Sequence, residues 1–471
     1  MQQVFQPHQI SLLYRKLYYA GLFVYIFLCI IAAVFFVERI VFLDTAFTVF
    51  HIAKDGNFAI QISRFGDGLS RILPLAAYAL GRPLHTICKL YSVGFVLVYF
   101  ACYLICGTYL RQYGLALVIL MVNILFVSDS FYWPTSQAPQ AIALTMVLLA
   151  TLWNKKPTDL GKMEMLISTA LVVTIAFFHP LMALCFLFIA GFIILRNDSH
   201  IDRKLMFSVG LVFAFSLLVK TLFFRDQYER HSLSGIKNFI RLFPKYFDTY
   251  ANRNFLATIA TKYYWIAIVF ILTLAKYVKD RQYKMAFFFS GMVLGYLLLV
   301  NTSYPTDKTP AFYIEVLYLP LGLFLALPLL FDLLPAWRPQ YAAAMAVLIM
   351  ISGGWRIYSS HSVYTARVNW ERRFLQQYGH KKMIVSSKTA GAARLQMLWG
   401  SPYEFWLLST LENGYSASII IDDSPAHRAW AAEKYKDLIV NWDVVPYKGL
   451  NPKYFRLPDT TTGYQIDPAL P

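Results

Sequence analysis

Asp44 is the residue best placed for chemistry, because it is an acid that lies seven residues beyond the first apolar segment. The stretch 44–55 has Phe47 and Phe50 three residues apart and is followed by Gly56, which predicts a short amphipathic helix along the membrane surface. A carboxylate at the lipid boundary could act as a general base on an acceptor hydroxyl. The alternative is that Asp44 is the N-cap of this helix, a common role for Asp. Spacing alone leaves both interpretations open.

Basic residues recur in two long polar loops. Guanidinium groups bind phosphate oxygens in a bidentate manner, so several of them converging would hold a lipid-linked phosphate or pyrophosphate. The alternative is contact with lipid headgroups without specificity. The candidates for a donor-phosphate site are Arg64, Arg71, Arg225, Arg230 and His231.

A third group of ionisable residues lies in or beside apolar segments, where such groups usually face a cavity or a partner. Lys220 could instead extend toward the headgroups, and His179 could simply stabilise the turn with Pro180. Asp129 precedes an aromatic run, 131–133, that either forms a membrane-interface belt or stacks on a sugar. The candidate cavity-lining residues are Lys54, Asp129, His179, Lys220, Lys308 and Glu315.

The composition requires a membrane to position these residues. Of 471 residues, 58% are hydrophobic and 15% charged, whereas soluble domains have about 25% charged residues. A soluble fold and a disordered chain are therefore excluded. The net charge of +17 is dispersed between apolar runs, which favours anionic lipids or phosphates as partners over nucleic acid. The five cysteines have no metal-binding spacing, so we expect neither disulfides nor structural zinc.

Eleven apolar segments are long enough to predict membrane spans. A twelfth, 69–81, is too short and is expected to be an interfacial or re-entrant helix. With eleven spans, the short basic connections all lie inside, which places the N-terminus in the cytoplasm and the C-terminus outside. The predicted spans are 17–37, 87–110, 114–131, 137–153, 162–178, 180–195, 205–224, 261–278, 285–301, 311–331 and 340–357.

The tail changes character after the last span. We expect a helix over 361–378, strands over 383–386, 418–422 and 443–447, and a helix that begins at Ser424-Pro425 and ends near Leu438. The predicted fold is thus an all-α polytopic membrane protein with a small C-terminal extracytoplasmic α/β domain. The membrane domain covers 1–358, with outer loops 38–86 and 225–260, and the α/β domain covers 359–471.

This arrangement resembles the GT-C superfamily of integral-membrane glycosyltransferases. The similar features are the first-loop segment Glu38-Arg-Ile-Val-Phe-Leu-Asp44, the two predicted surface helices 44–55 and 69–81, and the outer α/β tail. The segment 79–90, which leads into a span ending at Tyr109-Leu-Arg111, also looks like the family's passage from surface helix to second span.

The resemblance implies an inverting sugar transfer from a polyprenyl-phosphate donor to a glycan, lipid or protein acceptor. Asp44 would take the acceptor proton, while basic side chains or a divalent metal hold the leaving phosphate. Asp44 is followed by Thr45, and the second outer connection has only Asp129, which favours a monophosphate held by Arg and Lys. The expected location is a bacterial inner membrane with a periplasmic tail, and the expected role is in polysaccharide biosynthesis for the cell envelope.

Three other functions remain open from the sequence, one of which is that of a purely structural membrane subunit. An O-antigen-type polymerase or ligase would place its chemistry in the mid-chain loop, around 225–231, and would not need Asp44. A transporter or flippase of lipid-linked substrates would often show two related halves and broken helices. We find no repeat at a fixed period.

Overall fold

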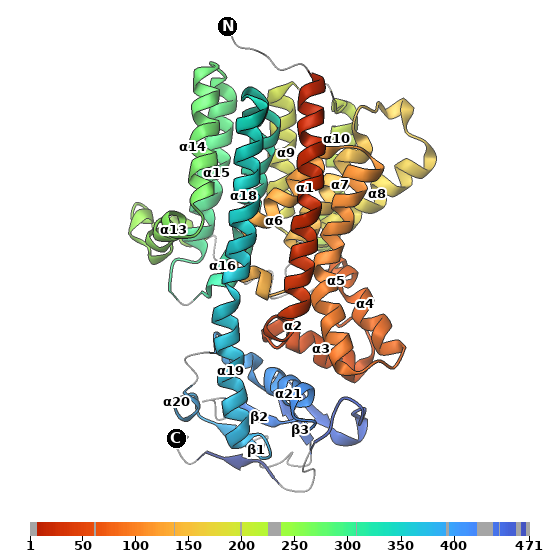
Figure 1. The fold of residues 1–471 in the computed structure, drawn as a ribbon, viewed down its shortest axis with the longest axis vertical. Coiled ribbons are helices and arrows are strands. Elements are labelled where there is room, and N and C mark those ends of the chain that lie inside the picture. Colours follow the sequence, from red (N-terminus) through yellow and green to blue (C-terminus); the bar gives the residue numbers. More distant parts are fainter. Residues whose placement is uncertain are drawn as a thin grey trace.

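The computed structural model describes residues 7–60, 63–135, 137–197, 200–224, 237–307, 309–391, 395–421, 437–441, 443–457 and 463–467. Each of the predicted apolar segments contains a helix (Figure 1). These helices are α1 (Pro7–Val34), α5 (Leu84–Leu104), α6 (Tyr113–Leu125), α7 (Ala138–Leu152), α8 (Lys162–Ala176), α9 (Met182–Arg196), α10 (Arg203–Phe223), α14 (Tyr264–Lys279), α15 (Tyr283–Ser303), α16 (Ala311–Leu317) with α17 (Leu319–Pro328), and α18 (Pro339–Ser359).

Six helices in the described part of the chain are long and apolar enough to cross a membrane. The number is seven if α14 and the preceding α13 (Tyr250–Thr261), which meet at 89°, form one broken span. Large apolar side chains on the outside of the bundle are exposed, for example Phe23 (74%) and Phe287 (82%). Exposed apolar surface on this scale indicates contact with lipid, so the chain is a membrane protein.

The predicted span 311–331 is wrong as a single continuous helix. α16 ends at Leu317 and α17 begins at Leu319, with Pro320 in its first turn. Proline has no backbone N–H and restricts the residue before it, which favours a new helix start at this point. The break matters because Phe312 and Glu315, on α16, face the connection that follows α6.

The bundle is built around α6, whose residues from Leu115 to Leu125 are all buried. The helices α1, α5, α7, α17 and α18 pack against it. The start of α1 lies at one end of the bundle and the C-terminal region at the other (Figure 1). Three short helices, α2 (Phe36–Ile40), α3 (Leu43–Asp55) and α4 (Gly68–Ala79), lie at the same end as the C-terminal region.

The helix predicted over 44–55 is present as α3, and Gly56 ends it with φ +61°. As a surface helix, α3 was expected to turn its apolar face toward the membrane, and this expectation is wrong. Phe50 is fully buried and its ring packs edge-on against Tyr403 and Trp406 of the C-terminal region. Burial between two protein layers removes this face from lipid and fixes α3 in place.

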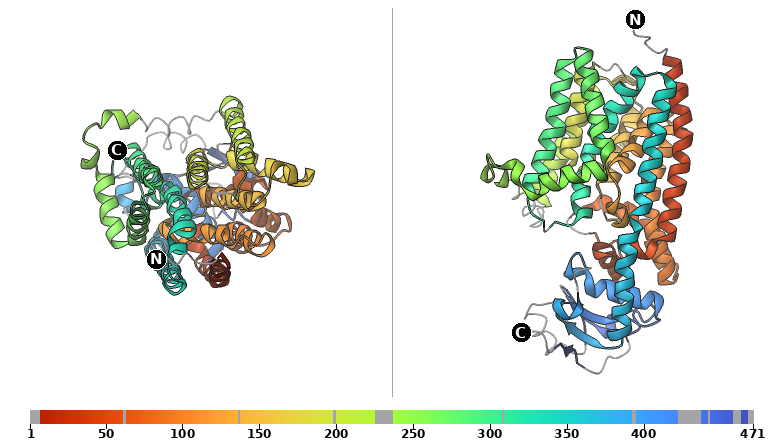
Figure 2. Two further views of the ribbon diagram at one scale, coloured as in Figure 1. Left: turned by 90° about the horizontal axis from the view of Figure 1, so that it is seen from above. Right: turned by 60° about the vertical axis from the view of Figure 1, so that its left-hand side comes forward.

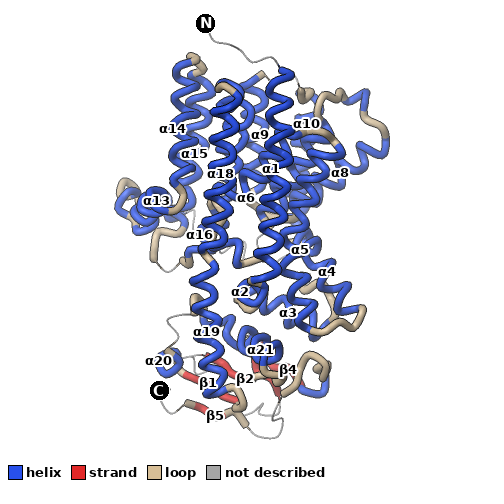
Figure 3. The backbone as a smooth tube through the Cα atoms, in the orientation of Figure 1, coloured by secondary structure: helices blue, strands red, loops and turns tan. Residues whose placement is uncertain are grey.

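The C-terminal region begins with α19 (His361–Tyr378), which continues from α18 away from the bundle (Figure 2). Strands occur only here in the described chain (Figure 3). β1 (Lys382–Val385) lies between β2 (Ser418–Ile421) and β5 (Gln465–Ile466) in a parallel sheet, and β3 (Asp437–Val440) pairs antiparallel with β4 (Asp443–Pro446).

Predicted strands at 383–386, 418–422 and 443–447 correspond to β1, β2 and β4. The helix expected to start at Ser424 lies mostly outside the described residues, and its predicted end is wrong because Leu438 belongs to β3. The sequence Asp437-Leu-Ile-Val440 is rich in branched residues that suit a strand. The remaining short helices are α12 (Lys237–Arg241), α20 (Ser387–Ala390) and α21 (Ser401–Glu412).

Candidate functional site

Asp44 lies in the first turn of α3, and its side chain is half-buried. The N-cap position is Phe42, so the interpretation of Asp44 as the N-cap is wrong. Its Oδ2 instead accepts a hydrogen bond of 3.1 Å from the indole Nε1 of Trp133. Burial raises the pKa of Asp44 to about 6, although the Trp133 hydrogen bond opposes this shift. A carboxylate with this pKa is largely ionised at pH 7 and is more basic than an ordinary Asp, as a general base requires.

Asp67 and Arg71 form a buried ion pair at the start of α4, with side chains 4% and 3% exposed. Both charges act on the pKa of Asp44, so the pair lies near it. Arg71 also donates hydrogen bonds to the carbonyl oxygens of Phe58 and Ala59. The guanidinium of Arg71 is therefore bound within the first loop, and its predicted role in binding the donor phosphate stays a prediction.

Gln137 connects this ion pair to a cationic cluster. Its Oε1 accepts a hydrogen bond of 3.1 Å from Arg64, and its side chain also contacts the carboxylate of Asp67. Gln137 immediately precedes α7. An amide suits this position because its oxygen accepts from a cation while its nitrogen donates to a carboxylate.

The cationic cluster consists of Arg64, His179 and Lys220, which come from the first loop, the turn between α8 and α9, and α10. Burial lowers the pKa of His179 well below its usual range, and the charges of Arg64 and Lys220 lower it further. The His179 ring is therefore neutral. Its Nδ1 accepts a hydrogen bond of 3.2 Å from the backbone of Leu181, which leaves the ring proton on Nε2 as a donor. Two cations and one neutral donor form a suitable environment for an oxyanion.

An apolar groove of about 480 Å³ is lined by residues that flank members of this cluster in the chain. One of its walls comes from the first loop and α4 and the other from α8. Two lining residues are neighbours of the cluster in the chain, since Phe65 follows Arg64 and Phe177 lies two residues before His179. The groove is lined by Phe58, Ile60, Phe65, Gly66, Gly68, Leu69, Ile72, Val173, Thr174 and Phe177.

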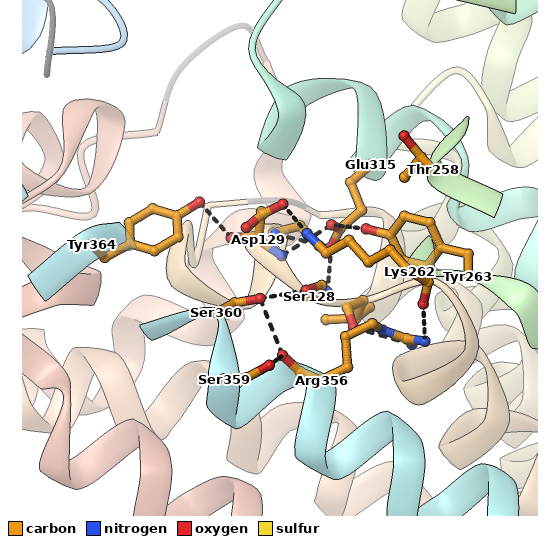
Figure 4. A network of polar contacts seen from close by, with 12 residues as sticks. Ser128, Asp129, Thr258, Lys262, Tyr263, Glu315, Arg356, Ser359, Ser360 and Tyr364 are labelled. Carbon is orange, nitrogen blue, oxygen red and sulfur yellow. Dashed lines mark hydrogen bonds and ion pairs between the residues drawn. The ribbon is translucent and has the colours of Figure 1, made fainter. Parts of the chain in front are cut away.

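Glu315 fastens the connection that carries Trp133. Its buried carboxylate accepts hydrogen bonds from the backbone N–H groups of Ser128, Asp129 and Ser130 and from the hydroxyl of Tyr263 (Figure 4). A carboxylate that satisfies three consecutive backbone donors fixes the path of the chain. Glu315 was predicted to face a cavity or a partner, and the structure shows the partner.

Two further cations stabilise the same region. Lys262, at the bend between α13 and α14, forms an ion pair with Asp129. Arg356 of α18 donates to the carbonyl oxygens of Ile124, Leu125 and Val127 at the end of α6, and to that of Lys262 (Figure 4). These carbonyls are the groups that a helix C-terminus leaves without partners. Asp129 is therefore bound into this network and does not line the groove.

The remaining candidates lie elsewhere. Lys54 is 3.4 Å from Asp443 at the contact with the C-terminal region. Arg225, Arg230, His231 and Lys308 lie outside the described residues. Sequence reasoning missed Asp67 and Gln137, and it named Trp133 only as part of the aromatic run 131–133, without a link to Asp44. Of these, only Asp67 has a local signal, because it precedes Arg71 by four residues, the spacing of a helical ion pair.

In the described part of the chain, no group of three or more His, Cys, Asp or Glu side chains comes together to hold a metal ion. Three buried polar side chains, which lie near Asp44 or Gln137 in the chain, have hydrogen-bonding atoms without a partner among the residues that the structure describes: Thr45, Thr135 and Gln140. Comparison of the chain with protein-family models, with curated proteins and with solved structures gives no match.

Proposed function

We propose that this protein is a membrane glycosyltransferase of the GT-C type, which transfers a sugar from a polyprenyl-phosphate donor to an acceptor hydroxyl. The observation that carries the proposal is the succession of three features. The apolar groove is lined by chain neighbours of Arg64 and His179, these two residues form a cationic cluster with Lys220, and Gln137 and the Asp67–Arg71 pair link this cluster to the region of the Asp44 carboxylate. A polyprenyl phosphate has an apolar chain, an anionic head and a sugar in the same order.

In the proposed reaction, the acceptor hydroxyl oxygen attacks the anomeric carbon from the face opposite the phosphate. The new carbon–oxygen bond forms while the bond to the phosphate oxygen breaks, so the configuration inverts. Asp44 takes the hydroxyl proton, and polyprenyl phosphate leaves with the bonding electron pair. Arg64, Lys220 and the Nε2–H of His179 stabilise the charge that develops on the phosphate. The unpaired groups of Thr45, Thr135 and Gln140 suit a hydroxyl-rich ligand.

We further propose the eleven-span topology, with the N-terminus in the cytoplasm and Asp44 on the extracytoplasmic side. An odd number of spans fits the placement of the start of α1 and the C-terminal region at opposite ends of the bundle (Figure 1). The helices α6, α7, α8 and α9 have only 13–15 residues each, so these four spans would be completed by the connections that flank them.

The test uses purified protein in lipid nanodiscs, incubated with a panel of polyprenyl-phosphate hexoses and pentoses and with a cell-envelope glycan fraction as acceptor. Release of free polyprenyl phosphate is measured, and binding of polyprenyl phosphate is measured separately. We expect Asp44→Asn to lose about 10²–10⁴-fold in turnover, the range for removal of a general base, with little change in binding.

Arg64→Gln is expected to weaken binding of polyprenyl phosphate instead, by roughly 10- to 100-fold, because a charged hydrogen bond contributes about 1.5–3 kcal/mol. Asp55→Asn, on the same helix as Asp44 but paired with His51, is the matched control and should keep both properties. An Asp44→Asn protein with normal turnover would contradict the assignment of the base. Transfer activity that persists in Asp44→Asn would favour a polymerase with its chemistry in the 225–260 loop.

A further inference from the structure

The three residues immediately before Asp44 are each held by the C-terminal region. Arg367 of α19 donates a hydrogen bond to the carbonyl oxygen of Val41, and its guanidinium lies 4.6 Å from the centre of the Phe42 ring. Oε1 of Glu404, on α21, accepts a hydrogen bond of 2.6 Å from the backbone N–H of Leu43. A segment more than 300 residues away in the chain therefore fixes the entry to α3.

Leu43 adopts a backbone conformation that needs such support. Its φ of +41° lies in the left-handed region, which is unfavourable for a residue with a branched side chain. The side chain of Leu43 is 1% exposed and packs against Gly400, next to α21. A Cβ added to Gly400 would lie 2.7 Å from Leu43 Cδ2 and 3.1 Å from Leu43 Cα. The C-terminal region thus packs closely against Leu43 and also accepts a hydrogen bond from its backbone.

The side chains that hold this turn form a buried charge cluster. Nη1 of Arg367 is 2.5 Å from Glu371 and 3.0 Å from Oε2 of Glu404, and all three side chains are at most 3% exposed. Burial raises the pKa of Glu371 well above its usual range. The two carboxylate oxygens of Glu404 make two different contacts. Oε2 lies at ion-pair distance from Arg367, and Oε1 accepts the hydrogen bond from the Leu43 N–H.

We propose that Glu404 is a positioning residue for Asp44, so that the C-terminal region completes the reaction centre. Asp44 is held on one side by Trp133 and, through Leu43, on the other side by Glu404. This inference rests on the proposed function for its catalytic consequence. The hold on the Leu43 turn itself does not depend on the proposed function and can be measured without activity.

The test compares Glu404→Ala and Glu404→Gln with Glu412→Ala. Glu404→Ala removes the acceptor of the Leu43 N–H but leaves Arg367 paired with Glu371, so the fold should survive. Glu404→Gln keeps an oxygen in the same place to accept the Leu43 hydrogen bond, so this variant should behave like the parent protein. Glu412 is on the same helix but forms a half-exposed ion pair with Arg372, which makes it the matched control.

We expect Glu404→Ala to lower kcat on the order of 10- to 100-fold, because displacing a reacting group by about 1 Å has effects of this size. Binding of polyprenyl phosphate should not change, and Glu404→Gln and Glu412→Ala should stay within a few fold of the parent. A merely structural role would lower thermal stability without separating kcat from binding, and that result would overturn the proposal.

Hydrogen–deuterium exchange of the peptide 39–46 gives the second readout. Glu404→Ala should speed its exchange, whereas Glu404→Gln and Glu412→Ala should not, and parental exchange in Glu404→Ala would overturn the proposal. Should Glu404→Ala not fold, Gly400→Ala displaces Leu43 by contact and must give the same faster exchange. If exchange is faster in Glu404→Ala but the parent protein transfers no sugar, only the proposed function is refuted. The result would still support the stabilisation of the Leu43 turn by Glu404.

Discussion

Trp133 and Asp44 are joined by a hydrogen bond of 3.1 Å from the indole Nε1 to Oδ2, although 89 residues separate them in the chain. The tryptophan ring is itself fixed on its other side, where it packs edge-on against Phe312 of α16 at 4.7 Å. Because the indole donates to the ionised form of Asp44, it opposes the rise in pKa that burial causes. Trp133 therefore sets how much of the carboxylate is available as a base near neutral pH.

This relationship predicts a shift in the pH dependence of transfer. A general base works in its ionised form, so kcat/KM should fall as the pH drops through the Asp44 pKa of about 6. Trp133→Phe keeps an aromatic ring but removes the donor, so the pKa should rise and the acidic limb should move to higher pH. Measuring kcat/KM between pH 5 and 9 for both proteins checks this, and superimposable acidic limbs would contradict it.

The apolar elements were predictable from sequence because their signal is local. A hydrophobic run long enough to cross a bilayer needs no knowledge of its neighbours, and each predicted run is helical in the structure. Local sequence does not predict what packs against the apolar face of an amphipathic helix. The spacing of Phe47 and Phe50 shows that α3 has an apolar face, but lipid and the C-terminal region satisfy that pattern equally well.

The candidate site was predictable by residue type more than by arrangement. Arg64, His179 and Lys220 were named for their charge or polarity beside apolar segments, and their convergence depends on how α8 and α10 pack. Arg71 has the same chemical character as Arg64, yet it is committed to Asp67. Long-range partners such as Trp133 for Asp44 leave no periodic signal, so only the folded chain reveals them.

A second prediction concerns the groove. Thr174 lines it, and Thr174→Trp should fill part of its volume. Each buried methylene contributes about 0.8 kcal/mol, so displacing two methylenes of a lipid should weaken its binding roughly tenfold. The loss should appear with a long polyprenyl phosphate and not with a short-chain alkyl phosphate in nanodiscs. Leu166→Trp, on the same helix at a position 64% exposed, is the control. Equal losses for both chain lengths would refute a lipid site in the groove.

A third prediction separates Arg71 from Arg64. Removing one partner of a buried ion pair leaves the other charge uncompensated, which costs about 3–5 kcal/mol. Arg71→Gln should therefore lower the thermal unfolding temperature markedly, because Asp67 is 4% exposed in its side chain. The double variant Asp67→Asn, Arg71→Gln should recover much of this loss, since no lone charge remains. An Arg71→Gln protein of parental stability with weakened binding of polyprenyl phosphate would instead place Arg71 at the donor site.

The last prediction concerns the orientation of the chain, because Asp44 can meet an extracytoplasmic acceptor only if the first loop lies outside. Three exposed positions sample the two ends of the bundle: Lys156 and Lys204 in predicted cytoplasmic connections, and Asn413 in the C-terminal region. Each is replaced by cysteine in a variant whose five native cysteines are substituted, and intact cells are treated with a membrane-impermeant thiol reagent.

Asn413→Cys should be labelled. Lys156→Cys and Lys204→Cys should be labelled only after the membrane is permeabilised, since short basic connections stay in the cytoplasm. Labelling of Lys156→Cys in intact cells would reverse the orientation of the whole bundle and place the C-terminal region in the cytoplasm, because that region lies at the end of the bundle opposite to the start of α1 (Figure 1). Asp44 would then have to be reassigned along with the topology, because α3 is packed against that region.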